Sequence, residues 1–227
     1  MTARRRPVAL LAAAGIAFLV LMALGIWQVQ RLAWKNDLIA RVDARVAAEP
    51  VPAPGPAEWA RLTAEAAEYR RVTVTGEYAP DSDVLVQAVT ERGPGFWVMT
   101  PFATDDGWTL LVNRGFVAGD RRDDRPLPAG AQTVKGLLRL SQPGGAFLRA
   151  NDPGAGRWYS RDTQAIVVTL GLPEVAPYFI DADRAGEGQP IGGLTVIAFR
   201  NHHLSYALTW FAMAGGLVVL TVYALRR

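Results

Sequence analysis

The stretch 8-VALLAAAGIAFLVLMALGI-26 decides the fold of this chain, because it contains no charged and no strongly polar side chain. A second apolar run, 204-LSYALTWFAMAGGLVVLTVYAL-225, lies near the other end and is interrupted only by hydroxyl-bearing side chains. As helices, these runs would cover about 28 to 33 Å, which is close to the hydrocarbon thickness of a bilayer. The sequence therefore predicts two membrane-spanning helices, at residues 8–27 and 203–225.

A cleaved secretory signal is the alternative for the first run. Arg4-Arg5-Arg6 would form its basic region, and Ala23-Leu24-Gly25 would form its cleavage site. Retention is favoured because the run is longer than the apolar part of an ordinary signal. It also leads into Trp27, an aromatic residue of the kind that lies at membrane interfaces, and then into a charged helical pattern.

Basic residues predict the orientation of the two spans. The tails at 1–7 and 226–227 are rich in arginine, which favours a cytoplasmic position for both. Residues 28–202 would then form one external domain. We expect a bacterial inner-membrane protein with this domain in the periplasm, the mitochondrial inner membrane being the alternative.

The external segment is predicted to be an α+β domain with mainly antiparallel strands. A helical pattern continues to about residue 48, and a Pro-rich linker follows at 50–56. Asp105-Asp106-Gly107 is a turn signal that predicts a hairpin, whereas Gly93-Pro94-Gly95 is interpreted as an isolated turn. The remaining expected elements are helices at 57–68 and 161–170, strands at 71–75, 84–89, 96–102, 108–112, 133–140 and 178–181, and loops at 119–130 and 141–156.

Composition limits the chemistry. The chain has no cysteine and only two histidines, His202 and His203, so disulfides, thiolate metal sites and Ser–His or Cys–His catalytic pairs inside the external domain are excluded. The net charge of +3 is more than accounted for by the arginines of the two tails, which gives no support to nucleic-acid binding. The sequence indicates a binding protein and not an enzyme.

Helical spacing places His203, Tyr206, Ala207 and Trp210 on one face of the second span. The small Ala207 would leave room for a flat ligand between the imidazole and the indole, whereas His202 belongs to a neighbouring polar stripe. Two interpretations stay open. Periodicity alone favours an interfacial aromatic belt, and the alternative is that His203 ligates a cofactor.

Scattered motifs carry a resemblance to a known family. They are Leu24-Gly25-Ile26-Trp27-Gln28 with Arg31 and Lys35, Tyr69-Arg70-Arg71-Val72 with Gly76, Gly93-Pro94-Gly95-Phe96 with Pro101, Val112-Asn113-Arg114-Gly115, Gly136-Leu137-Leu138-Arg139, Trp158-Tyr159 with Asp162, and Asn201-x-His203-Leu204-x-Tyr206-Ala207-x-Thr209-Trp210. In this order and spacing the chain resembles the Surfeit locus protein 1 family, which are membrane assembly factors for haem-copper oxidases, chiefly cytochrome c oxidase.

The resemblance implies that the protein binds haem a as cargo and assists its insertion into oxidase subunit I. It implies His203 as the iron ligand, with Trp210 and Tyr206 beside the haem. Arg114 would pair with a haem propionate or, alternatively, form an ion pair inside the domain. The implied partners are subunit I, haem a synthase and the lipid bilayer. A scaffold that stabilises subunit I without touching haem is the alternative function.

Overall fold

Two long helices and one β-rich region make up the computed structural model, which describes residues 5–144, 149–186, 188, 190–197 and 199–226. The chain divides into a helical unit, Met1–Asp43 with Ile197–Arg227, and a β unit, Ala44–Val196. Helix α1 spans Arg5–Ala47 and helix α5 spans His203–Arg226. Both are long and apolar enough to cross a membrane, so the structure is that of a membrane protein with an external domain.

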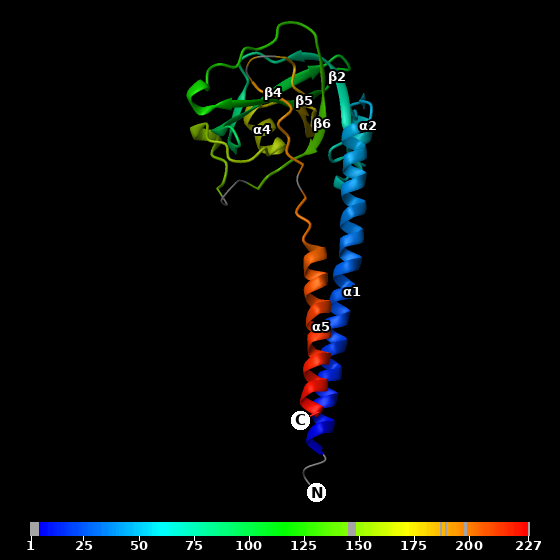
Figure 1. Cartoon of the computed structure of the whole chain (residues 1–227). Helices are drawn as coiled ribbons and strands as arrows, with labels where there is room; N and C mark the ends of the chain where they lie inside the picture. The colour runs from blue at the N-terminus through cyan, green and yellow to red at the C-terminus, as the bar shows by residue number, and fades with distance from the viewer. Residues whose placement is uncertain (1–4, 145–148, 187, 189, 198, 227) are drawn as a thin grey trace. The chain divides into compact units, whose positions relative to one another are not determined.

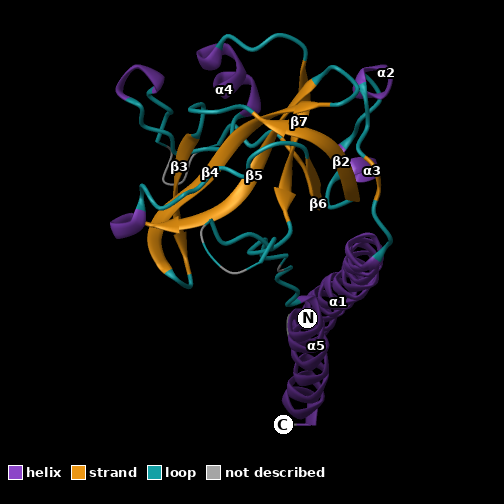
Figure 2. Cartoon of the chain, turned by 90° about the horizontal axis from the view of Figure 1, so that it is seen from above, coloured by secondary structure: helices purple, strands orange, loops and turns teal. Residues whose placement is uncertain are grey.

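Helix α1 is continuous over 43 residues, so the predicted span and the helical pattern that follows it belong to one helix. Its length is about 65 Å, roughly twice the thickness of the hydrocarbon core. Helix α5 runs antiparallel beside α1 in the helical unit, as Figures 1 and 2 show. The first turns of α1 and the last turns of α5 therefore lie at the same end of the pair.

The β unit is one seven-stranded sheet, visible in Figure 2, in the order β1-β2-β6-β7-β5-β4-β3. A further pairing between β2 and β4 closes the ring β2-β6-β7-β5-β4. The strands are β1 (Val51–Pro52), β2 (Arg71–Tyr78), β3 (Val84–Thr90), β4 (Gly93–Thr104), β5 (Thr109–Ala118), β6 (Gln132–Leu140) and β7 (Val175–Ala182).

Gly76 lies where β2 changes partner. It pairs with Gln132 of β6 on one side and with Thr104 of β4 on the other. Its φ of +155° is a conformation that side chains rarely adopt, and a Cβ there would lie 2.0 Å from the carbonyl oxygen of Ala103. The ring closes at this position because glycine allows the two backbones to approach this closely.

Apolar side chains are buried on both faces of the central strands. On β5 and β7, Leu110 and Tyr178 point into the cluster enclosed by the ring, whereas Leu111 and Phe179 point to the opposite cluster, which contains Ile166 of α4 (Thr163–Leu170). Strands covered on both faces are apolar at consecutive positions, which explains why the period-two pattern is weak there. Helix α4 begins at its N-cap Asp162, whose side chain accepts a hydrogen bond from the Ala165 amide, as expected for a capping aspartate.

The structure agrees with the mainly antiparallel α+β prediction, with five of seven strand pairings antiparallel. The β1–β2 and β5–β7 pairings are parallel. The hairpin at Asp105-Asp106-Gly107 is confirmed, since it joins β4 to β5. Within the predicted Pro-rich linker, Val51–Pro52 forms β1.

Two local predictions are wrong. The helix expected at 57–68 is broken into α2 (Pro56–Trp59) and α3 (Ala64–Ala67), because the extended Thr63 caps the second helix with its own side chain. Gly93-Pro94-Gly95 is not an isolated turn but the beginning of β4, paired with β3. The expected loop at 119–130 begins with the 3₁₀ turn Gly119–Arg121. The expected loop at 141–156 contains a second 3₁₀ turn at Pro153–Ala155. Residues 145–148 of this second loop lie outside the described part of the chain.

Candidate functional site

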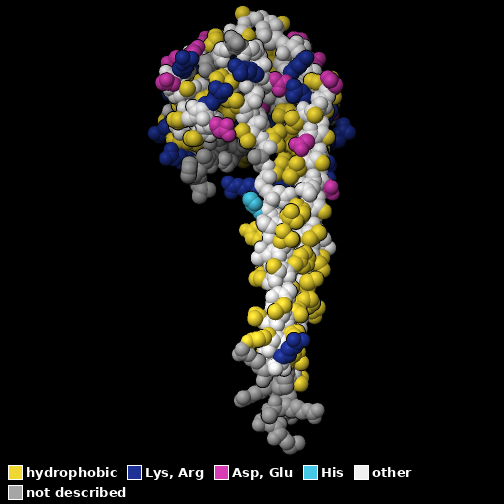
Figure 3. Space-filling model, viewed as in Figure 1, with side chains coloured by type: hydrophobic (Ala, Val, Ile, Leu, Met, Phe, Trp, Pro, Cys, Tyr) yellow, Lys and Arg dark blue, Asp and Glu magenta, His cyan; other side chains and the backbone are white. Residues whose placement is uncertain are grey.

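The two long helices pack along a seam with the spacing of a coiled coil. On α5 the covered positions recur in steps of four and three at His203, Ala207, Trp210 and Ala214. On α1 the same spacing gives Leu21, Gly25, Gln28 and Leu32. This 3.5-residue repeat keeps one stripe of each helix against its neighbour. The outward faces carry hydrophobic side chains, which Figure 3 shows along the helix pair.

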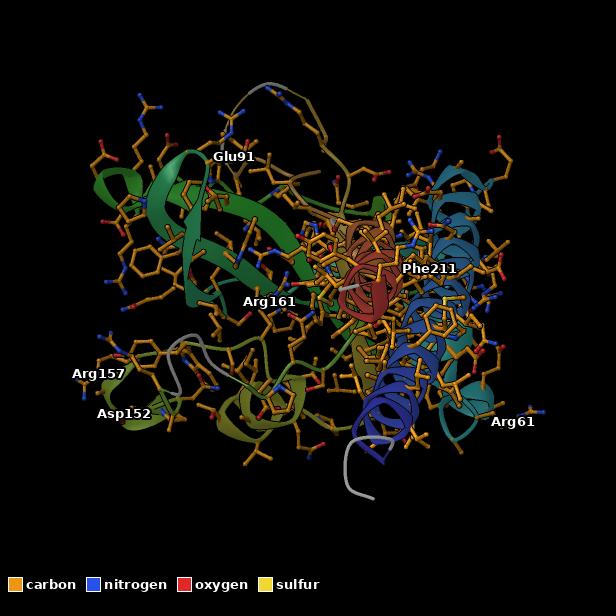
Figure 4. All side chains as sticks on the ribbon, turned by 60° about the horizontal axis from the view of Figure 1, so that its bottom comes forward. Arg61, Glu91, Asp152, Arg157, Arg161 and Phe211 are labelled. Carbon is orange, nitrogen blue, oxygen red and sulfur yellow. The ribbon has the colours of Figure 1, made fainter. Side chains whose placement is uncertain are left out.

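Four contacts define the register of the seam. The side chain of Asn201 donates to Asn36, the Lys35 ammonium lies 4.9 Å from the centre of the Phe199 ring, and His203 bonds to Gln28. Further along, Gly25 lies against the ring of Phe211, which is labelled in Figure 4, and a Cβ on Gly25 would lie 2.4 Å from it. On the helices themselves, Gln28 meets His203 at the start of α5 and the earlier Gly25 meets the later Phe211, so the pair is antiparallel.

The structure places His203 at the first residue of α5, partly buried in the seam. Its Nδ1 lies 2.7 Å from Oε1 of Gln28, which is only 9% exposed. In the described part of the chain, no hydrogen-bond partner is found for the other ring nitrogen, Nε2. An amide oxygen can only accept, so a neutral His203 ring in this pair donates from Nδ1 and keeps its lone pair on Nε2, the nitrogen that can bind a metal.

The four residues expected on one face of α5 are divided by the seam. His203 and Trp210 are partly buried and Ala207 is 2% exposed, but Tyr206 is 57% exposed and points away from the pair. The expectation that Ala207 leaves room for a flat ligand is wrong, because helix α1 covers that position. A ligand on His203 would therefore lie at the edge of the seam and not inside it.

His202 lies outside the seam, as its separate stripe predicted. Its side chain is exposed, and its carbonyl oxygen accepts a hydrogen bond from the hydroxyl of Ser205. The Thr209 hydroxyl in turn donates to the Ser205 carbonyl, so the polar stripe is occupied by bonds within the helix.

Arg114 belongs to the β unit and is buried there, in β5. Its guanidinium pairs with Asp83 at 3.5 Å and donates to the carbonyl oxygens of Arg125 and Pro126. It also lies over the ring of Tyr78. The ion pair inside the domain, one of the two roles considered from the sequence, is thus present in the structure.

A polar cavity of about 260 Å³ in the β unit is a second place where a ligand could bind. Its wall includes Arg139 and Arg161, both paired with Asp181, and Arg139 also pairs with Glu68. Burial lowers the pKa of Arg161, an effect that Asp181 opposes. The two arginines are balanced by Asp181 in the wall and by Glu68 behind Arg139, and Glu91 is the remaining charged residue that lines the cavity.

Sequence reasoning did not select Gln28. The residue stands in the first motif, next to Trp27, which is 53% exposed. A polar side chain within a membrane-spanning helix is by itself a candidate for function, and this signal was available. Among the described residues, no group of three or more His, Asp or Glu side chains could hold a metal ion.

Comparison with known proteins gives a consistent result. A model described as the SURF1 family matches residues 15–215. The chain is 36% identical over 213 residues to Surfeit locus protein 1 of Mus musculus, covering 84% of this chain and 67% of the relative. It is 36% identical over 215 residues to the Homo sapiens protein of that name, covering 84% and 69%. A SURF1-like protein of Monosiga brevicollis is 34% identical over 229 residues, covering 92% and 84%.

Proposed function

Because the chain belongs to the SURF1 family, we propose that it is a non-enzymatic assembly factor for a haem-copper oxidase, chiefly cytochrome c oxidase. In this role it binds haem a through His203 and assists its insertion into subunit I. Subunit I and haem a synthase are its proposed protein partners. The bacterial inner membrane is its proposed location, with the β unit in the periplasm.

One observation carries the haem proposal, namely the hydrogen bonding of the two nitrogens of the His203 ring. One nitrogen is bonded to Gln28 at 2.7 Å, and the other has no partner among the described residues. A histidine that ligates a metal commonly donates its second N–H to an oxygen acceptor, which orients the ring. The site fits a haem iron in this respect, and the apolar outer faces of α1 and α5 suit the porphyrin.

Trp210 lies seven residues after His203 on the same stripe, about 10 Å along the helix axis. It is partly buried, and its indole is a flat apolar surface on the same stripe of α5 as His203. The exposed ring of Tyr206 lies on the adjoining surface of α5. Both residues are proposed to contact the porphyrin by packing, not by ligation.

The test is an absorption spectrum of the full chain purified from cells that make haem a. We expect a haem a spectrum for the unaltered chain and for His202→Ala, whose side chain is exposed outside the seam. We expect its loss in His203→Ala. A haem-free chain, or a His203→Ala chain that keeps the spectrum, contradicts the haem proposal. If subunit I still copurifies with such a chain, the haem-independent scaffold is supported instead.

The proposed orientation has its own test. The chain has no cysteine, so a single Asp106→Cys substitution in the exposed β4–β5 turn introduces the only thiol. A membrane-impermeant maleimide added to intact spheroplasts should label this thiol if the β unit is periplasmic. Labelling that requires disruption of the membrane would place the domain in the cytoplasm.

A further inference from the structure

We propose that Gln28 is a positioning residue for the iron ligand, since it holds His203 as the Nδ1–H tautomer and presents Nε2 to the metal. The inference rests on the proposed haem function and adds to it a residue on the other helix. The haem site would then be built from both spans, with the ligand on α5 and the group that orients it on α1.

With Oε1 of Gln28 facing Nδ1, the bond fixes the tautomer of a neutral His203 ring. Neutral imidazole carries one proton, and a ring that binds metal through Nε2 must carry that proton on Nδ1. In the described structure, the acceptor within hydrogen-bond distance of Nδ1 is Oε1 of Gln28, at 2.7 Å. The reverse tautomer would place a proton on Nε2 and prevent ligation. The acceptor on α1 therefore selects the form of His203 that can bind iron.

The surroundings of Gln28 keep this acceptor in place. Its side chain is nearly buried in the seam, three residues from Gly25, which lies against the ring of Phe211. A small residue at a helix–helix contact brings the two backbones close together. Because Gln28 is confined in this way, its amide oxygen stays beside Nδ1, and no other described side chain bonds to that nitrogen.

A purely structural role for Gln28 makes different predictions. A buried polar pair can fix the register of a coiled coil, in which case its loss would alter the helix pairing and any effect on haem would follow from that. A positioning role instead changes the electronic properties of the bound iron while the helix pairing stays the same. The two roles can be separated by measuring both properties in the same variants.

The variants are Gln28→Leu, which removes the acceptor, and Gln28→Glu, which keeps an oxygen acceptor and adds negative charge. The matched control is Gln30→Leu, the same change at an exposed position two residues away. The probe is ferric haem b, titrated into the full chain in detergent micelles. Binding is followed by absorption, the Fe–His bond by resonance Raman of the ferrous form, and the midpoint potential by redox titration.

We expect Gln28→Leu to weaken haem binding by about 10- to 100-fold, the usual effect of removing an orienting partner of a metal ligand. Gln28→Glu should bind haem, with a higher Fe–His frequency and a lower midpoint potential, because a carboxylate increases the basicity of the imidazole. Gln30→Leu should match the unaltered chain. In a His203→Ala background, Gln28→Leu should have no further effect, since the two residues act through one bond.

Helix pairing is measured separately. Cysteines at Asn36 and Asn201, whose side chains are hydrogen-bonded, are joined by a short thiol crosslinker in the otherwise cysteine-free chain. Equal crosslinking in every Gln28 variant, together with the shifts above, supports the positioning role. The inference is overturned if Gln28→Leu and Gln28→Glu leave affinity, frequency and potential unchanged, or if their effects appear only with lost crosslinking. Haem binding that survives His203→Ala would instead overturn the proposed function.

Discussion

Replacing Asp181 should destabilise the β unit more than any ordinary surface change. This carboxylate is 5% exposed and lies on β7 in the middle of the sheet. It accepts hydrogen bonds from Asn113 of β5 at 2.7 Å, from Arg139 of β6 at 2.9 Å, from Arg161 at 3.0 Å and from Thr195 at 2.9 Å. One side chain thus connects three strands to the segments that flank α4 and follow β7.

The size of the expected destabilisation follows from the hydrogen bonds that the partners of Asp181 keep when it is replaced. In Asp181→Leu, Arg139 keeps its bond to Glu68 and Arg161 keeps its bonds to Gln142, but both lose their shared carboxylate. Removing one partner of a buried ion pair costs about 3–5 kcal/mol. For a domain of this size, each kcal/mol lowers the melting temperature by about 2–4 °C, so we expect a decrease of about 6–20 °C. Asp181→Asn, which retains one oxygen acceptor, should cost about 2 kcal/mol.

The assay is thermal and urea unfolding of the full chain in detergent, followed by near-ultraviolet circular dichroism, which reports the aromatic core of the β unit. Asp106→Asn is the control, because Asp106 lies exposed in the β4–β5 turn, and it should change stability by less than about 0.5 kcal/mol. If Asp181→Leu unfolds like the unaltered chain, the attraction between these charges only balances the cost of burying them, and the reasoning is refuted.

Three further outcomes are expected. Gly115→Ala should lower the free energy of unfolding in urea by about 2–5 kcal/mol, because a Cβ would lie 2.3 Å from the Ile191 backbone at a φ of +131°. Gly107→Ala should lower it less, because its φ of +85° strains the backbone but the space around it is open. Burial raises the pKa of Tyr78 to about 12, so the stability contributed by its phenol is complete below its unfolded value of 10.0 and is lost as pH rises towards 12. The unaltered chain should therefore lose on the order of 2–3 kcal/mol more than Tyr78→Phe over this range, and equal losses would contradict it. Ala207→Leu should reduce crosslinking between the two helices by overpacking the seam, and the exposed Ala212→Leu should not.

Local sequence signals predicted the elements whose physical cause is local. The two apolar runs lie in α1 and α5, the helix expected at 161–170 is α4, and Asp105-Asp106-Gly107 turns β4 into β5. The errors have local causes too. Thr63 competes for the backbone and divides the expected helix, and Gly93-Pro94-Gly95 enters an edge hairpin that tolerates proline.

Ring closure was not predictable from such signals. It depends on the pairing of β2 with β4 and on the parallel pairing of β5 with β7, which join segments far apart in the chain. The same is true of Asp181, whose four partners come from four separate segments. No spacing in the sequence shows that these side chains meet, because their proximity follows only from the register of the strands.

The sequence alone determined that chemistry in this protein has few places to occur. The chain has no cysteine, its two histidines are adjacent at the start of α5, and helical periodicity puts His203 and His202 on different stripes. The tertiary structure decided what surrounds His203. Helix α1 covers Ala207, leaves Tyr206 outside the seam, and brings the oxygen of Gln28 to Nδ1, 175 residues away in the chain. The reason is that periodicity fixes which side chains share a face, whereas the packing of a second helix decides which of them remain accessible and which hydrogen bonds they form.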